Sequence, residues 1–128
     1  MLVPRANHAC TDIKDKAGKV VKILVAGGVE NVNAQSALES TEVYDVEKKY
    51  WKMGPNLFYP TLGSSLVHAD KSSPSYVYLL GGCQYDKNGK RRGNCSEVYS
   101  LSENTDDWRK VGDLNQPRTD HVALLPSP

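Results

Sequence analysis

Val25-Ala26-Gly27-Gly28, followed by Glu42-Val43-Tyr44 and then Trp51, is the stretch that decides the fold, because the chain repeats it. The second copy reads Leu79-Leu80-Gly81-Gly82, then Glu97-Val98-Tyr99, then Trp108. The double glycines lie 54 positions apart, the tyrosines 55 and the tryptophans 57. Self-similarity at one period indicates a repeat protein, in which a unit cannot bury its own apolar faces and stacks on its neighbours.

Short apolar runs between turn residues indicate strands, and they occur in the same order in both units. The first unit predicts strands at 7–13, 20–26, 40–46 and 50–53, and the second at 63–69, 76–80, 96–101 and 107–111. A Pro-Arg-x-x-His stretch at 4–8 returns at 117–121, so 119–125 would begin the series a third time. The single helix candidate, 34–42, lies where the repeat places a loop.

A double glycine after an apolar strand, a tyrosine further on and then a tryptophan resemble the kelch repeat. The resemblance implies an all-β protein, a fragment of a kelch-type β-propeller, with two four-stranded antiparallel blades at 5–60 and 61–117 and the first strand of a third, incomplete blade at 118–128. It also implies that the remaining blades belong to the same or another chain. The residues that carry the repeat are expected to be structural, with the tyrosines and tryptophans largely buried between blades: Gly27, Gly28, Tyr44, Trp51, Gly81, Gly82, Tyr99 and Trp108.

The topology of such a blade locates a functional surface. With four antiparallel strands a to d, the b–c loop and the connection to the next blade share one face, and the b–c loops at 29–39 and 83–94 are long. Long loops on a rigid scaffold usually carry binding residues, and kelch-like propellers commonly bind proteins through them. The resemblance therefore implies a non-catalytic protein-interaction scaffold, such as a substrate adaptor or a cytoskeletal-binding protein. The candidate partner-binding residues are Glu30, Asn31, Asn33, Gln35, Tyr85, Lys87, Lys90, Arg91 and Arg92.

The second b–c loop is locally basic, with Lys87, Lys90, Arg91 and Arg92 around a turn signal at Asn88-Gly89. One interpretation is a small hairpin that contacts an acidic partner surface. The other is a solvated loop tip, which is what most charge runs are. The sequence leaves both open.

Overall charge and hydropathy give no direct indication of partner or compartment. The 16 Lys plus Arg nearly balance the 15 Asp plus Glu, which does not favour nucleic acid or an anionic membrane. No apolar run approaches the roughly 18 residues of a membrane span. Residues 1–16 lack the apolar core of a signal peptide, which favours the cytoplasm, although a chain that lacks its true beginning would look the same.

Two cysteines bear on the compartment as well. Cys83 and Cys95 flank the second b–c loop, and their counterparts Val29 and Ser40 are expected to face each other across the mouth of the first hairpin. A disulfide and two free thiols both remain open. Asn94-Cys95-Ser96 also fits the N-glycosylation pattern, so an extracellular location stays open as well.

No catalytic, cofactor-binding or metal-binding residues are predicted. His8, His68 and His121 fall on innermost strands, but no H-x-x-H or C-x-x-C spacing supports a metal. The phosphate-binding glycine patterns and the G-x-S-x-G motif are also missing. The alternative function is a fragment of a propeller enzyme, of the galactose-oxidase-like or sugar-isomerising kind.

Overall fold

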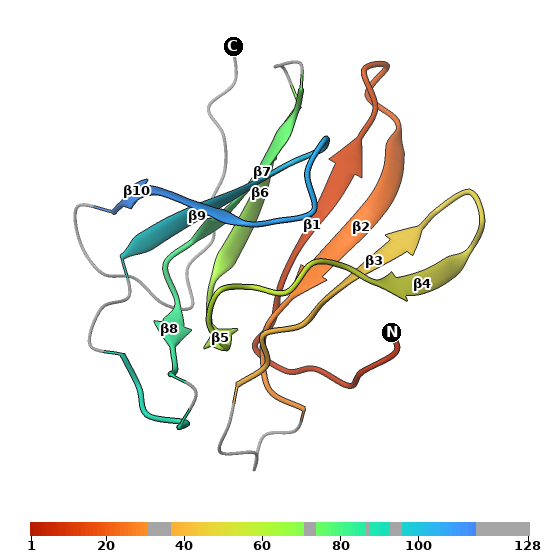
Figure 1. Ribbon diagram of the computed structural model, residues 1–128. Helices are drawn as coiled ribbons and strands as arrows, with labels where there is room; N and C mark the ends of the chain where they lie inside the picture. The colour runs from red at the N-terminus through yellow and green to blue at the C-terminus, as the bar shows by residue number, and fades with distance from the viewer. Residues whose placement is uncertain (31–36, 71–73, 87, 93–95, 115–128) are drawn as a thin grey trace.

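Two four-stranded antiparallel sheets make up the architecture (Figure 1). The computed structural model describes residues 1–30, 37–70, 74–86, 88–92 and 96–114. The first sheet has the order β1-β2-β3-β4, with bounds Ala9–Lys14, Val20–Ala26, Thr41–Asp45 and Tyr50–Met53. The second has the order β6-β7-β9-β10, with bounds Ser65–Ala69, Tyr76–Leu80, Glu97–Ser102 and Arg109–Asp113. A small sheet pairs β5, Thr61–Leu62, with β8, Cys83–Gln84.

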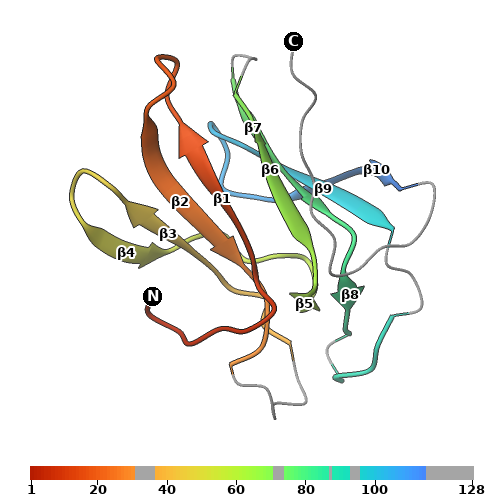
Figure 2. The ribbon, with the colours of Figure 1, turned by 180° about the vertical axis from the view of Figure 1, so that it is seen from behind.

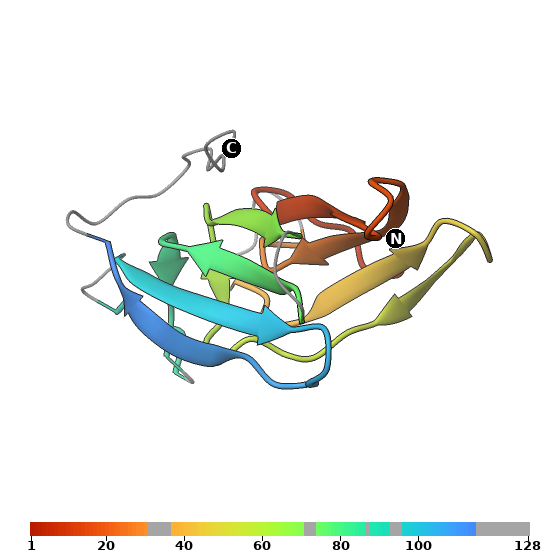
Figure 3. The same ribbon diagram turned by 90° about the horizontal axis from the view of Figure 1, so that it is seen from above.

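The two large sheets lie side by side and bury one face of each in a common core (Figures 2 and 3). Side chains alternate between the faces of a strand, so Leu24 and Ala26 of β2 point to the same side. They share one buried cluster with residues of the second sheet, and the cluster consists of Ala9, Leu24, Ala26, Leu57, Leu66, Val77, Leu79, Tyr99 and Trp108. The hydrophobic effect across this interface holds the two sheets together.

The predicted fold class is confirmed. The described chain is all-β with antiparallel sheets, and each of the eight predicted strands has a counterpart. No described residue lies in a helix, and the described part of the helix candidate, 37–42, ends inside β3. The sequence missed β5 and β8, because two-residue strands are too short to show periodicity. The predicted third-unit strand at 119–125 lies outside the described residues.

The repeat aromatics are buried more completely in the second blade than in the first. Tyr99 is 4% exposed and Trp108 is 1% exposed, since both face the first sheet. Tyr44 and Trp51 are only partly buried and pack on each other, with ring centroids 5.1 Å apart. Their neighbour Val43 points into the core, so they occupy the opposite face of the first sheet, which no described element covers.

The two sheets differ in register although their sequences repeat. Tyr44 pairs with Ile23, four residues before Gly27, whereas Tyr99 pairs with Leu79, two residues before Gly81. The hairpin after the tyrosine differs as well, since the tryptophan follows by seven residues in the first unit and by nine in the second. A shift of two residues leaves every side chain on its original face, so Tyr99 can still enter the core.

The double glycine of the first unit lies against the backbone at Thr61, near the start of the second unit. Gly27 and Gly28 have φ of +68° and +90°, a region that favours glycine. The Gly28 N–H donates to the Thr61 carbonyl at 2.7 Å, and the Thr61 N–H donates to the Leu38 carbonyl at 3.0 Å. A Cβ atom added to Gly27 would lie 2.2 Å from the Thr61 carbonyl oxygen. A side chain at Gly27 would therefore force one of the two backbone segments to move.

Gly27→Ala tests this close approach, with Gly18→Ala as the matched control. Gly18 also has a positive φ, of +85°, but an added Cβ would meet nothing within 4 Å. We expect Gly18→Ala to lower the free energy of unfolding by about 1–2 kcal/mol, from backbone conformation alone. Gly27→Ala should cost about 1–3 kcal/mol more, from the added clash. Urea denaturation followed by tryptophan fluorescence measures both, and equal losses would contradict the proposed contact.

Candidate functional site

A groove of about 550 Å³ lies on the face that carries the b–c loops and the connection between the blades. Leu38 comes from the first b–c loop, Phe58 and Tyr59 from the connection, and Tyr85 from the second b–c loop. We call it the aromatic groove. Its size lies within the range of about 300–1,000 Å³ that is usual for ligand pockets. The face deduced from strand direction is thus also a hollowed one.

The connection between the blades is anchored by one residue and displays the next. Leu57 is buried, and its N–H donates to the Glu39 carbonyl at 2.8 Å. Phe58 is 54% exposed, while its ring and that of Tyr99 pack in a T-shaped arrangement with a centroid distance of 5.2 Å. A half-exposed aromatic ring that rests on a buried one is a rigid apolar contact surface.

The second b–c loop begins as a paired strand and closes as a tight turn. The Tyr85 N–H donates to the Pro60 carbonyl at 2.9 Å, which ties the loop to the connection. Asp86 Oδ1 accepts from the N–H groups of Asn88 and Lys90, both at 2.9 Å, and the Gly89 N–H donates to the Asp86 carbonyl at 3.0 Å. A carboxylate that caps its own turn fixes the tip, as the Asn88-Gly89 signal predicts.

Arg92 turns inward from this loop. Its Nη1 donates to Gln84 Oε1 at 2.6 Å and lies 3.2 Å from Glu97 Oε2, and its guanidinium carbon sits 3.9 Å from the centre of the Tyr59 ring. The side chain is 31% exposed. Charge-assisted hydrogen bonds and the cation–π contact together fasten the loop to the floor of the aromatic groove.

The first blade has its own buried arginine, which the sequence reading did not single out. Arg5 Nε lies 2.9 Å from Glu42 Oε2, and neither side chain is exposed. Its Nη1 donates to the carbonyls of Gly27 and Ser40, at 3.0 and 2.8 Å. The Pro-Arg-x-x-His motif could have indicated this arginine. Arg5 is the motif's arginine in the first unit, whereas the second unit lacks the motif and has Thr61 at that place. Arg92 supplies the missing positive charge to the second blade from a different direction.

Both glutamates are held ionised by these partners. Burial acts to raise the pKa of Glu97, but the hydrogen bonds from Tyr99 and Arg92 outweigh it and leave that pKa below its usual range. For Glu42, burial is likewise outweighed by the Leu2 N–H and by Arg5, so its pKa is lowered too. The Tyr99 hydroxyl donates to Glu97, and burial together with this bond raises the pKa of Tyr99.

The predicted partner-binding residues fall into three groups. Tyr85 lines the aromatic groove, and Glu30, Lys90 and Arg91 are exposed. Arg92 is largely engaged within the fold. The remaining four, Asn31, Asn33, Gln35 and Lys87, lie outside the described residues. A binding role for any of them stays a prediction.

The connection between the blades contributes groove residues that the sequence reading did not propose, above all Phe58 and Tyr59. A signal was present, because two adjacent aromatic residues precede Pro60 in a segment that strand direction assigns to the loop face. The connection is short, so loop length alone does not mark it as a binding segment.

The cysteine argument from the first unit is wrong. Ser40 does not face Val29, because the Ser40 carbonyl accepts from the Gly27 N–H at 3.1 Å and Val29 pairs with Ala6. The different register of β3 and β9 is the reason. Cys83 itself is buried and pairs with Leu62, and Cys95 lies outside the described residues, so the disulfide remains a prediction.

Among the residues that the structure describes, no group of three or more His, Cys, Asp or Glu side chains is arranged to hold a metal ion. His8 Nδ1 and His68 Nε2 are buried and have no hydrogen-bond partner in this part of the chain. The described residues contain no helix that is long and apolar enough to cross a membrane.

Comparison with known proteins agrees with this geometry. Four-stranded antiparallel sheets packed face to face define the blades of a β-propeller. Residues 22–57, which run from within β2 through β3 and β4, match the family model described as the Kelch motif. The match is to one repeat of the chain, and the all-β antiparallel fold is consistent with a fragment of a kelch β-propeller. Kelch repeats generally mediate protein–protein interactions, and most proteins that contain them are non-enzymatic scaffolds.

Two curated proteins are similar to the chain. Alpha-scruin of Limulus polyphemus is 25% identical over 124 residues, which are 96% of this chain. The DNA (cytosine-5)-methyltransferase PliMCI of Paracentrotus lividus is 33% identical over 60 residues, which are 47% of this chain. The chain spans 12% of the length of the first and 4% of the length of the second.

Replacing Arg92 tests whether it fastens the second b–c loop. Arg92→Gln removes the ion pair with Glu97 and the cation–π contact, so we expect a loss of about 1–3 kcal/mol in the free energy of unfolding. Lys90→Gln, at an exposed site on the same loop, should change it by less than about 0.5 kcal/mol. Amide hydrogen exchange at Tyr85 should rise in Arg92→Gln only. Unchanged exchange there would show that the loop does not depend on Arg92.

The lowered pKa values of Glu42 and Glu97 predict acid sensitivity. A carboxyl group whose pKa is lower in the folded state stabilises the fold above its unfolded pKa, and this stabilisation is lost as pH falls through the folded value. With an ordinary value of 4.5, the free energy of unfolding should decline as the pH falls below about 5. Urea titrations at pH 7, 5, 4 and 3 would show it. Glu97→Gln should flatten this decline, and an unchanged slope would contradict the assignment.

Proposed function

We propose that the chain is a non-catalytic protein-interaction scaffold that binds its partner on the loop face. The observation that carries the proposal is the aromatic groove, because Phe58 and Tyr85 present apolar surface on the same face as the exposed Lys90 and Arg91. Aromatic residues and arginine are enriched in the energetically dominant parts of protein interfaces. The general role of kelch repeats supports the same conclusion.

The chemistry of the surface suggests the chemistry of the partner. The groove would accept an apolar side chain or a proline, and the turn tip beside it would contact acidic residues. Glu39 and Asp86 also line the groove, but Asp86 already accepts hydrogen bonds from its own turn. We therefore propose a partner segment in which an apolar residue lies next to an acidic one.

The proposed blades are residues 5–60 and 61–117, and 118–128 would begin a third. The partly exposed face of the first sheet, with Tyr44 and Trp51, would then pack against another blade of the same or another chain. This part of the proposal predicts that these two aromatics become buried when the ring is complete. The remaining candidates, Glu30, Asn31, Asn33, Gln35 and Lys87, would extend the binding surface along the b–c loops.

Selection from a displayed library of random 12-residue peptides tests the binding surface without knowledge of the partner. We expect selected peptides to combine apolar and acidic residues and to bind more weakly as salt is raised. Tyr85→Ser together with Phe58→Ser should weaken them about tenfold or more, since residues of this kind often cost over 1.4 kcal/mol. Lys90→Ser with Arg91→Ser should mainly reduce the salt dependence.

The control for these variants is Glu47→Ser with Lys48→Ser, on the exposed β3–β4 turn. Arg92 is left intact in every variant, because its replacement would disturb the loop itself. Peptides that bind equally to all variants would overturn the loop-face proposal. Salt dependence that survives without Lys90 and Arg91 would leave that turn as ordinary solvated surface.

A further inference from the structure

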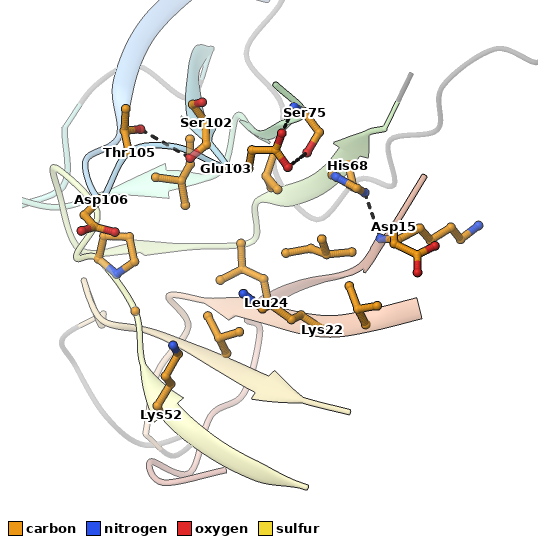
Figure 4. A pocket seen from close by; sticks show the side chains of 18 of the residues that line it. Asp15, Lys22, Leu24, Lys52, His68, Ser75, Ser102, Glu103, Thr105 and Asp106 are labelled. Atoms are coloured by element: carbon orange, nitrogen blue, oxygen red, sulfur yellow. Dashed lines mark hydrogen bonds between the residues drawn. The ribbon is translucent and has the colours of Figure 1, made fainter. Parts of the chain in front are cut away.

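A second cavity, of about 610 Å³, lies between the two large sheets and shares no lining residue with the aromatic groove. Lysines and carboxylates line it together, among them Lys22, Lys52, Asp15 and Glu103 (Figure 4). Its described lining contains no phenylalanine, tyrosine or tryptophan. Mixed charges over an aliphatic floor select no particular ligand, whereas the lining of the aromatic groove is chemically distinctive.

The aromatic groove offers side chains rather than free backbone to a partner. Four of its lining residues, Leu38, Tyr85, Asp86 and Gly89, already donate their N–H groups to backbone carbonyls of the fold. A peptide that binds by strand addition needs a continuous row of unpaired backbone groups. Recognition in this groove must therefore rely on the side chains that line it.

The charges around the groove do not favour an anionic occupant. Glu39 and Asp86 line it, while Lys90 lies on the turn at its edge. Arg92 is already paired with Glu97. A phosphorylated residue or a free C-terminal carboxylate would need available arginines or backbone N–H groups, and two lining carboxylates would repel it. The centre of the groove is thus best matched by a neutral segment.

The apolar part of the lining consists of aromatic rings that are held in place before binding. Phe58, Tyr59 and Tyr85 contribute these rings. The Phe58 ring packs against that of the buried Tyr99, and the Arg92 guanidinium carbon lies 3.9 Å from the centre of the Tyr59 ring. Rings that are fixed in advance provide a large contact area at a low cost in conformational entropy.

Two tyrosine hydroxyls are the polar groups left to give specificity. The hydroxyls of Tyr59 and Tyr85 form no hydrogen bond with any residue that the structure describes. Each can donate to a carbonyl of a bound peptide. A helix uses its carbonyls internally, but a polyproline II segment has no internal hydrogen bonds, so its carbonyls are available as acceptors.

We propose that the aromatic groove binds a proline-rich segment of a partner protein in the polyproline II conformation. The proposal rests on the proposed function, because it names the segment that the loop face would take. The prolines would lie on the aromatic rings, and the hydroxyls of Tyr59 and Tyr85 would donate to the carbonyls of the segment. Since proline has a fixed φ and no N–H, such a segment is ordered before it binds and leaves no backbone donor unpaired at its prolines.

Three synthetic ten-residue peptides with identical flanks and capped ends test this. Their four central residues are all proline in the probe, alternate leucine and glycine in the apolar match, and are all lysine in the cationic match. Titration into the whole chain, followed by amide signals in NMR, should shift Phe58, Tyr59 and Tyr85. The proline peptide should bind about tenfold more tightly than either match, because its conformation is fixed before binding.

The decisive variant is Tyr59→Phe with Tyr85→Phe, which removes both hydroxyls and keeps both rings. We expect it to weaken the proline peptide by about fivefold or more, from the loss of the hydrogen bonds. The matched control is Tyr50→Phe, at an exposed position of β4, which should bind as the unchanged chain does. Amide signals away from the groove check that the variants keep the fold.

The outcomes separate this proposal from the broader one. A leucine–glycine or lysine peptide that binds in the groove as tightly as the proline peptide would overturn the proline-rich segment and leave the loop face as the binding surface. Unchanged affinity in Tyr59→Phe with Tyr85→Phe would overturn the hydroxyl contacts on which the polyproline assignment depends. If no peptide shifts the groove and the displayed library also yields none that depends on Phe58 and Tyr85, the loop-face function fails as well.

Discussion

The backbone contact between Gly27-Gly28 and Thr61 is the constraint on which the rest of the structure depends. It joins the end of β2 to the first residue of β5, and no side chain could be accommodated at Gly27 without a shift of the backbone. Because Thr61 is fixed there, the connection that precedes it must run across the loop face. This course places Phe58 and Tyr59 beside the second b–c loop. The aromatic groove is thus a consequence of how the blades are joined.

Each of the two blades pairs a buried glutamate with an arginine, but the two arginines come from different parts of the chain. Each has a buried glutamate in its third strand, and a buried carboxylate needs a partner to remain ionised. In the first blade Arg5 approaches from the segment before β1 and is fully enclosed. In the second, Arg92 approaches from the b–c loop and remains partly exposed. The second blade has therefore coupled its internal ion pair to a loop that also carries the exposed Lys90 and Arg91.

Because of this coupling, the basic loop is both charged and held in a fixed shape. A charge run on a solvated tip has no fixed geometry, but Asp86 caps this turn and Arg92 anchors its far end. The cation–π contact with Tyr59 extends the same network into the groove. Residues that hold their shape before binding lose less conformational entropy when a partner arrives. The geometry of the loop face is consistent with a prepared contact surface.

The sequence by itself determined the repeat, the strand order and the face on which the long loops lie, because apolar runs, glycine pairs and turn residues act over a few neighbours. It also identified Tyr99 and Trp108 as core residues. The tertiary structure alone decided the register of β9, the incomplete burial of Tyr44 and Trp51, and the inward turn of Arg92. Each of these depends on which segment lies across a sheet or a loop, and that segment is distant in the chain. A repeat in sequence fixes what kind of element forms, but hairpin length and neighbouring blades fix where each side chain comes to rest.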